Sequence, residues 1–346
     1  MKIAIHQKDN DFSSKWIEYC QKNKIDYKIV NCYDSDIINK VEDCDVLMWH
    51  FHQAISKDVL FAKELLYSLQ TAGKKVFPDF NTVWHFDDKI GQKYLLEAIG
   101  APLVPSYVFY DKEEALQWVN HTDFPKVFKL RRGAGSDHVK LVPNKHKAKK
   151  LVNKAFGRGF SQYDKITNLK DRWYKYKKGK TSFWNVMKGV FRLGKTTNFA
   201  KVVGPEKGYV YFQDFIPDNR YDIRVIVINN KAFAIKRLVR EGDFRASGSG
   251  HILYEKHHFD EDTIRLSFEI NEKVKSKCLA IDYVFKEGTP LIAEVSYGFV
   301  KEGYYPCEGY WDRELNWHEG PFDAQGWMVE SLIYEEAHSK KMGYTE

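Results

Sequence analysis

Short apolar strands alternate with amphipathic helices through the first eighty residues, and no other feature of the sequence constrains the fold as strongly. The pattern predicts strand, helix, strand, strand, helix and strand, in that order, at 2–7, 13–23, 26–32, 46–51, 57–71 and 75–77. Strands separated by helices of this length are joined by right-handed crossovers and form a parallel sheet. No GxGxxG sequence follows the first strand, so nothing here indicates a dinucleotide site. We therefore predict a Rossmann-like parallel-sheet domain at residues 1–85.

Two further units follow with different patterns. The second unit, 86–208, begins with a helix that ends at Gly100 and continues with strand-like runs at 104–110, 125–130 and 140–142. The third unit, 209–346, carries strand-like runs at 223–229, 232–239, 280–285 and 291–295. It ends in an aromatic tail, which is expected either to pack in the core or to present a platform for sugar rings. The whole chain is thus predicted to be an α/β protein of three units.

The charge of the chain is concentrated in one segment. Residues 140–207 contain 19 Lys and Arg against 3 Asp and Glu, whereas the rest of the chain has 35 basic and 44 acidic residues. We treat residues 144–207 as a basic insertion, in which aromatic rings alternate with cations between Arg172 and Phe191. Such a segment suits an anionic partner, such as a membrane surface or a phosphorylated glycan or lipid carrier, more than nucleic acid. The alternative is a solvated insertion whose rings pack on the body.

The cysteines and the hydropathy indicate the compartment. The five cysteines are scattered and include no CxxC pair, which is typical of a reduced protein without disulfides or a zinc site. No run of 18 apolar residues is present, and the first residues lack the apolar core of a signal peptide. We expect a cytoplasmic protein. A second expectation is that it contacts the inner face of the membrane peripherally.

Four sequence elements carry residues suited to phosphate chemistry. A strand ending at Lys129 precedes the glycine-rich stretch 133–136, and a second strand ending at Ile216 precedes Asp-Ile-Arg at 222–224. A basic loop, Gly-Asp-Phe-Arg, follows at 242–245. Asp282 and Glu294 lie on the last two predicted strands, at facing ends, where two carboxylates suit a hard, oxygen-ligated cation such as Mg²⁺. Each element alone is weak, because glycines often form plain turns and arginines often form surface ion pairs.

In this order, the four elements resemble the ATP-grasp superfamily, and in particular its carboxylate–amine ligases, such as the ribosomal-protein glutamate ligases and glutathione synthetase. The resemblance covers residues 85–300 apart from the basic insertion. It implies an ATP-grasp fold, in which two α+β subdomains clamp ATP, with the parallel-sheet domain in front of it. It also implies that ATP and Mg²⁺ are the cofactors.

The resemblance assigns nucleotide-binding roles position by position. Lys89 and Lys129 match the lysines that hold the phosphates, and a mobile loop over the phosphates includes Gly133, Gly135 and Ser136. Gln213 stands where the family usually has an acidic residue near the adenine amino group. The backbone of Asp214 and Ile216 is expected to read the adenine edge, and Asp222 to bind the ribose.

The resemblance also assigns catalytic and metal-binding roles. Three arginines are expected to face the phosphates and an acyl-phosphate intermediate, namely Arg224, Arg237 and Arg245. The expected Mg²⁺ ligands are Asp282, Glu294 and Ser296. Ser296 departs from the family pattern, because most relatives have Asn there, and Ser247 departs in the same way.

These residues predict an ATP-dependent carboxylate–amine ligase that forms an amide through an acyl phosphate and releases ADP. Its substrates are expected to be a small-molecule or glycan carboxylate and an amine, with a surface-polysaccharide precursor as one candidate acceptor. The alternatives are a phosphotransferase (a kinase) on the same fold, or a non-catalytic nucleotide-binding protein that docks an anionic polymer or a membrane. His50 and His52, at the end of a predicted strand, are further candidates for substrate contact.

Overall fold

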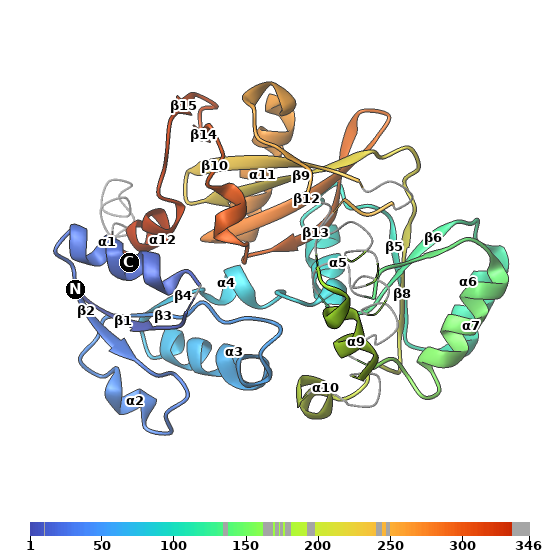
Figure 1. Cartoon of the computed structure of the whole chain (residues 1–346), viewed down its shortest axis with the longest axis horizontal. Coiled ribbons are helices and arrows are strands. Elements are labelled where there is room, and N and C mark those ends of the chain that lie inside the picture. Colours follow the sequence, from blue (N-terminus) through green and yellow to red (C-terminus); the bar gives the residue numbers. More distant parts are fainter. Residues whose placement is uncertain are drawn as a thin grey trace.

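The computed structural model describes residues 1–9, 11–133, 138–161, 181–191, 198–239, 244–246 and 250–333, together with Leu169, Trp173 and Tyr176. Gly135, Ser136 and Ser247, named above, lie outside the described residues. Figure 1 shows that the described part is organised around a parallel sheet at one end, a large antiparallel sheet in the middle and a small antiparallel sheet at the other end.

The parallel sheet is formed by the first eighty residues and has the strand order β2-β1-β3-β4. Its elements are β1 (Lys2–His6), α1 (Ser13–Lys22), β2 (Asp26–Val30), α2 (Ile37–Lys40), β3 (Val46–Met48), α3 (Ser56–Thr71) and β4 (Lys75–Phe77). Ile3, Ala4 and Ile5 are all buried, because helices α1 and α3 cover opposite faces of the sheet (Figure 1). The parallel α/β arrangement expected for this region is therefore confirmed.

The small antiparallel sheet has the strand order β5-β8-β6-β7. The elements from residue 80 to 214 that precede, form or cover it are α4 (Phe80–Val83), α5 (Lys89–Ala98), β5 (Ser106–Phe109), α6 (Lys112–His121), β6 (Lys126–Lys129), β7 (Lys140–Val142), α7 (Lys145–Ala155) and β8 (Val210–Asp214). Helix α7 begins the expected basic insertion, but Ala148, Val152 and Ala155 pack into the core of this subdomain. Strand β8, which the sequence pattern placed in the third unit, pairs with β5 and β6.

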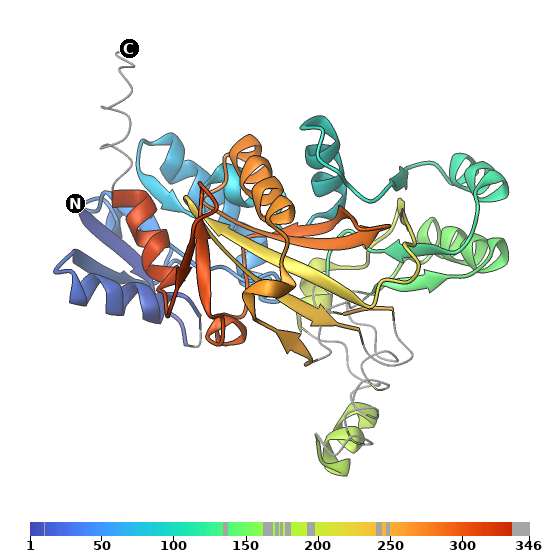
Figure 2. The same ribbon diagram turned by 90° about the horizontal axis from the view of Figure 1, so that it is seen from above.

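The large antiparallel sheet has the order β13-β12-β9-β10-β14-β15, and β11 pairs with β10. Its elements are β9 (Tyr221–Ile228), β10 (Lys231–Leu238), β11 (Ile252–Leu253), α11 (Glu261–Val274), β12 (Cys278–Lys286), β13 (Thr289–Ser296), β14 (Gly309–Asp312) and β15 (Trp317–Glu319). Helix α11 covers one face, as Figure 2 shows, with Ile264 and Phe268 in a core that includes Val225 and Ile281. The aromatic tail is largely core, since Trp311 and Trp327 are buried.

The other face of the large sheet is apolar over half its length and polar over the rest. At one end, Ile226, Phe233 and Cys278 join the core of the parallel-sheet domain. Helix α12 (Ala324–Ile333) extends this contact by packing beside α1. Lys75 Nζ anchors the end of α12 by donating to the carbonyl oxygen of Leu332 at 2.9 Å. The polar half of the same face is therefore held at a fixed position between the parallel-sheet domain and the small sheet.

Two helices belong to the later part of the basic insertion. They are α9 (Phe183–Phe191) and α10 (Asn198–Val203). Figure 2 shows α9 standing away from the three sheets, whereas α10 lies against α3. Among the residues that the structure describes, no helix combines the length and the apolar character needed to cross a membrane.

Candidate active site

A row of charged side chains crosses the polar half of the large sheet. The register places Asp282 on β12 opposite Arg224 on β9 and opposite Glu294 on β13. On the next pair of strands, Arg237 on β10 is opposite Asp222 on β9. Directly opposed residues point to the same side of a sheet, and residues two apart on one strand do so as well. Sequence periodicity and strand pairing thus bring these five side chains to one face.

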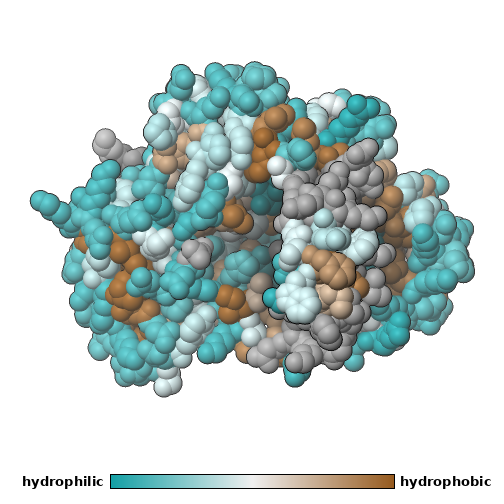
Figure 3. All heavy atoms as spheres, in the orientation of Figure 1, coloured by the Kyte–Doolittle hydropathy of each residue, from teal (hydrophilic) through white to brown (hydrophobic). Residues whose placement is uncertain are grey.

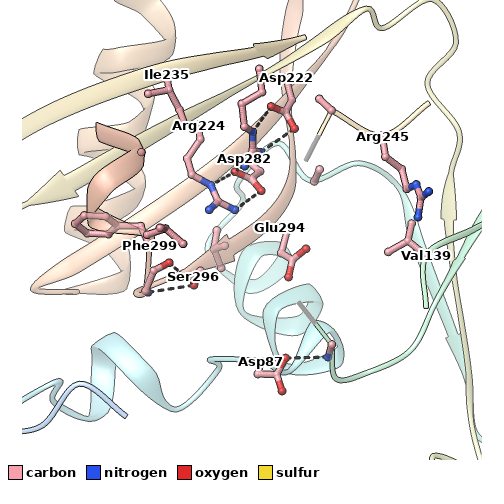
Figure 4. A pocket seen from close by; sticks show the side chains of 18 of the residues that line it. Asp87, Val139, Asp222, Arg224, Ile235, Arg245, Asp282, Glu294, Ser296 and Phe299 are labelled. Atoms are coloured by element: carbon pink, nitrogen blue, oxygen red, sulfur yellow. Dashed lines mark hydrogen bonds and ion pairs between the residues drawn. The ribbon is translucent and has the colours of Figure 1, made fainter. Parts of the chain in front are cut away.

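The arginines and aspartates of this row form a compact ion network (Figure 4). Arg224 donates to both carboxylate oxygens of Asp282, with an Nη2–Oδ2 distance of 2.6 Å, and Arg237 Nη2 lies 3.0 Å from Asp282 Oδ1. Arg237 also donates to both oxygens of Asp222, at 2.6 and 2.7 Å. Burial alone would raise the pKa of Asp282, but the two guanidinium groups outweigh it and hold that pKa below its ordinary value. Asp222, the expected ribose ligand, is therefore engaged by Arg237.

A second group of charges lies where the helix α5 meets the glycine-rich loop. Lys89 Nζ donates to the carbonyl oxygen of Gly133 at 2.8 Å and lies 3.2 Å from Glu294 Oε1. Asp87 accepts from the backbone N–H of Gly133 at 2.9 Å, so both the N–H and the carbonyl group of Gly133 are hydrogen-bonded. Burial raises the pKa of Asp87 to about 6. Asp87 was not singled out from the sequence, although it adjoins the helix that was predicted to open the second unit.

Lys129, at the end of β6, projects toward the same place from the small sheet. Its Nζ donates to the carbonyl oxygen of Ala293 at 3.2 Å, which links the two antiparallel sheets. The side chain is 7% exposed, and this burial lowers the pKa of Lys129 to about 8, against the opposing attraction of Glu294. A buried ammonium group that has so little negative charge around it is suited to bind a polyanion, because an added negative charge nearby stabilises its protonated form.

Two of the three expected Mg²⁺ ligands, the carboxylates, are brought together. Asp282 and Glu294 lie on neighbouring strands and face the cavity (Figure 4). Ser296 Oγ instead exchanges hydrogen bonds with the backbone N–H and carbonyl of Gly298, at 3.1 and 3.2 Å. Mg²⁺ needs few protein ligands, because it keeps several waters and takes phosphate oxygens, so the two carboxylates fit it. Within the described ranges, no cluster of three or more His, Cys, Asp or Glu side chains is suited to a metal.

The expected adenine-binding residues lie at the end of β8. Gln213 is buried, and its Nε2 donates to Ser106 Oγ at 3.0 Å. The Asp214 carboxylate accepts from Lys126 Nζ at 2.6 Å, while its backbone N–H donates to the carbonyl oxygen of Pro105 at 2.8 Å. The backbone N–H of Asp214 is therefore not available to a base, and its carbonyl group is the part that fits the expected role.

A cavity of about 810 Å³ is lined by most of these groups, although Lys89 is not part of its lining. Its lining includes Lys129, Ile216, Arg237 and Glu294, and also Arg245, which Figure 4 shows beside Val139 and apart from the Arg224–Asp282 pair. A volume in this range is typical of ligand sites. Figure 3 shows a hollow in the surface between the large sheet and the side of the molecule that carries α9.

The cavity continues to the edge of the parallel-sheet domain, where its lining includes Lys8, Asp11, His50, His52 and Lys301. Asp11 is buried; its Oδ1 accepts from the N–H and the hydroxyl of Ser13, and its Oδ2 has no hydrogen-bond partner among the described residues. Burial raises the pKa of Asp11. Asp11 was not predicted as a site residue, although residues that follow the carboxyl end of a parallel strand often contact ligands.

The two histidines line the cavity as expected, but each turns its Nδ1 toward the backbone. His50 Nδ1 accepts from the Phe12 N–H at 3.3 Å, and His52 Nδ1 accepts from the Ala54 N–H at 3.1 Å. Burial lowers the pKa of His50 to about 3, so its ring is neutral at physiological pH. Lys301 Nζ donates to the backbone carbonyl of Asp11 at 2.7 Å and so fixes the loop that carries this carboxylate.

Two antiparallel sheets that enclose a cavity lined by both cations and carboxylates, behind a parallel-sheet domain, agree with the ATP-grasp fold that the resemblance implied. Comparison with protein families agrees, since residues 180–302 match the model of the RimK-like ATP-grasp domain. The predicted ATP-grasp fold is thereby confirmed, and the matched domain agrees with the predicted resemblance to the ATP-grasp superfamily. The comparison with curated proteins found no match.

Solved structures with the same fold span nearly the whole chain. A RimK domain ATP-grasp protein from Sphaerobacter thermophilus has a TM-score of 0.55 at 14% identity, with 96% of this chain and 100% of that chain covered. The D-alanine–D-alanine ligase from Bacillus anthracis has a TM-score of 0.56 at 14% identity, with 99% of each chain covered. The biotin carboxylase domain of the Hydrogenobacter thermophilus 2-oxoglutarate carboxylase was solved with MgADP. It has a TM-score of 0.58 at 10% identity, with 96% of this chain and 70% of that chain covered. At these identities the likeness concerns the fold.

Proposed function

We propose that the protein is an ATP-dependent carboxylate–amine ligase that forms an amide and releases ADP and phosphate. The observation that carries this proposal is the continuous cavity that runs from Lys129 and the Asp282–Glu294 pair to the edge of the parallel-sheet domain, with Lys89 Nζ 3.2 Å from Glu294 Oε1. The part beside Lys129 suits a nucleoside triphosphate, and the part beside the parallel-sheet domain provides room for the groups to be joined. The match to a RimK-like ATP-grasp domain and the fold shared with D-alanine–D-alanine ligase support the same reaction class.

In the proposed reaction, the substrate carboxylate attacks the γ-phosphorus of ATP and expels ADP, which gives an acyl phosphate. The amine then attacks the acyl carbon, the carbon–oxygen bond to phosphate breaks, and the amine loses a proton as the amide forms. Lys129 and Lys89 would hold the phosphate oxygens and neutralise the charge on the transferring group. Arg245, which lines the cavity from the far side, would bind the acyl phosphate.

Asp282 and Glu294 would hold Mg²⁺, which would supply positive charge to offset the negative charge of the phosphates. For Asp282 to take part, Arg224 must release one or both of its bonds to this carboxylate. The released guanidinium would lie beside the phosphates on the same face of the sheet, where it would bind the developing negative charge. Arg237 would keep its bonds to Asp222 and hold that side of the network in place.

The part of the cavity beside the parallel-sheet domain would bind the amine substrate. Asp11 Oδ2, which has no hydrogen-bond partner among the described residues, would accept from the N–H groups of the amine. An unpaired carboxylate oxygen in a buried setting is costly, and a ligand donor removes that cost.

We extend the proposal to the acceptor, which we infer to be an anionic glycan or glycolipid precursor of the cell surface, modified at the inner face of the membrane. The excess of basic residues in 140–207 supports this extension, since an anionic carrier would be attracted to it. The aromatic tail does not support it, because Trp311 and Trp327 pack in the core instead of forming a sugar platform.

Phosphate release by the purified protein with ATP, Mg²⁺ and a panel of paired acids and amines tests the reaction. A ligase releases one phosphate for each amide formed, whereas a kinase forms ADP and a phosphorylated acceptor without free phosphate. The variant Glu294→Gln should reduce phosphate release by about a hundredfold or more, because it removes a carboxylate that would hold Mg²⁺ beside the transferring group. Glu97→Gln is the matched control, since Glu97 pairs with Lys93 on the surface. Equal loss in both variants, or no loss in Glu294→Gln, would refute the site.

A further inference from the structure

The helix α9 presents large aromatic side chains to solvent. Phe183 is 50% exposed and Trp184 is 65% exposed, and they are consecutive residues in the first turn. Trp173 and Tyr176, which are also exposed, extend this surface through ring contacts, with centroid distances of 5.7 Å from Trp173 to Tyr176 and 5.6 Å from Tyr176 to Phe183. We call these four residues the aromatic surface. Exposed apolar groups gathered in this way usually mark a site of interaction.

The sequence around the aromatic surface is strongly basic. Residues 170–195 contain nine Lys and Arg and a single acidic residue, Asp171. Helix α9 itself has Lys188 and no acidic residue. The partner of this surface must therefore carry negative charge and also accept apolar rings.

The position of α9 relates this surface to the active site. Figure 2 shows the helix standing away from the sheets, and Figure 3 shows apolar atoms over it on the face of the molecule that also contains the hollow. A flat partner bound to the aromatic surface would therefore lie across the same face as that hollow. A bilayer is such a partner, and its headgroups would then lie close to the cavity.

We propose that α9, with Trp173 and Tyr176, docks the protein on an anionic phospholipid surface. A short apolar helix with Trp and Phe, flanked by lysines and arginines, is typical of segments that lie in the headgroup region of a bilayer. Single-stranded nucleic acid prefers aromatic platforms along a basic groove, whereas Phe183 and Trp184 are exposed on a helix that stands apart from the three sheets. This inference deepens the proposed location at the membrane and does not depend on the ligase chemistry.

Flotation of the full-length protein with lipid vesicles tests the proposal. Vesicles of phosphatidylcholine with phosphatidylglycerol should bind the protein at least about tenfold more tightly than vesicles of phosphatidylcholine alone, and binding should weaken as salt is raised. The double variant Phe183→Ser/Trp184→Ser should lower the partition coefficient by about tenfold, since it removes the inserted rings. Ile38→Ser/Leu60→Ser is the matched control, because these side chains are 51% and 57% exposed on other helices. The control should bind as the unchanged protein does.

A second readout follows the rings directly. Phosphatidylcholine–phosphatidylglycerol vesicles whose acyl chains carry bromine should quench part of the tryptophan fluorescence, and Trp184→Phe should reduce the quenched part while still binding. Circular dichroism of each variant shows that it remains folded.

Three outcomes would overturn the proposal. They are equal binding to the two kinds of vesicle, unchanged binding of the Phe183→Ser/Trp184→Ser variant, and binding of a single-stranded oligonucleotide, but no vesicle, through the same residues. None of them affects phosphate release, so a failed docking surface and a failed ligase assignment are distinguishable.

Discussion

Replacing Lys129 with methionine should make the folded protein more stable and at the same time remove its ability to hold a nucleotide. Burial lowers the pKa of this lysine from 10.5 to about 8, which means that the protonated side chain costs the folded state about 3 kcal/mol at neutral pH. Methionine has a similar length and no charge, so it avoids this cost. It also leaves the carbonyl oxygen of Ala293 without its donor, which costs about 1 kcal/mol. The expected net gain is about 2 kcal/mol at pH 7.

The pH dependence of the free energy of unfolding follows from the lowered pKa of Lys129. The unfolded chain keeps the proton on Lys129 up to a pH near 10.5, whereas the folded protein loses it near pH 8. Between these values the unfolded state binds more protons, so the stability of the unchanged protein rises with pH. The difference in stability between Lys129→Met and the unchanged protein should therefore shrink by about 2 kcal/mol from pH 7 to pH 9.5, since methionine does not titrate.

Urea unfolding followed by circular dichroism at pH 7 and pH 9.5 measures both quantities. Lys126→Met is the matched control: Lys126 lies on the same strand and is equally buried, but its Nζ is 2.6 Å from Asp214 Oδ1, so its loss should destabilise the fold. The reasoning fails if Lys129→Met is less stable than the unchanged protein at pH 7, or if the stability difference does not vary with pH. A thermal shift induced by an ATP analogue should disappear in Lys129→Met, because the phosphates lose a cation.

Further substitutions test the other parts of the cavity. Asp282→Asn should lower the free energy of unfolding by about 3 kcal/mol, measured by urea titration, because it leaves Arg224 without the buried carboxylate that accepts both of its hydrogen bonds. Unaltered stability would show that this network does not hold the sheet face together. Asp11→Asn should raise the KM for the amine with little change in the KM for ATP, since Asn keeps the contacts to Ser13 but loses the charge. A rise in both KM values would place Asp11 in the nucleotide site instead.

The elements that could be predicted from sequence are those set by local pattern. The alternation of strands and helices in the first eighty residues gave the parallel sheet, and two carboxylates on adjacent predicted strands gave the facing positions of Asp282 and Glu294. The strands around residues 223–239 were also predicted, because their apolar runs are long and β-branched. A pattern of this kind depends only on a strand and its neighbours in the chain.

The pairings between distant segments were not predictable in the same way. The sequence placed β8 with the strands that follow it, yet β8 pairs with β5, about a hundred residues earlier. Ser296 was expected to ligand a metal, but it ends its strand and bonds to the turn at Gly298. Asp11 carries no motif; its importance appears only when Ser13 and Lys301 are seen to fix its loop. Such features depend on tertiary contacts, which local propensity does not encode.

The ion network gives a physical reason why the buried charges of the proposed nucleotide site are tolerated. A buried carboxylate or guanidinium without a partner is costly, so Asp282 and Arg224 satisfy each other before any ligand enters. Nucleotide and metal must therefore exchange these partners rather than simply add to them, and the binding energy is the difference between two sets of bonds. Lys129 is the exception, because its ammonium donates to a neutral carbonyl oxygen and its pKa falls to about 8. A triphosphate would gain most where the protein has compensated least, which is the physical reason for proposing that its phosphates bind beside Lys129.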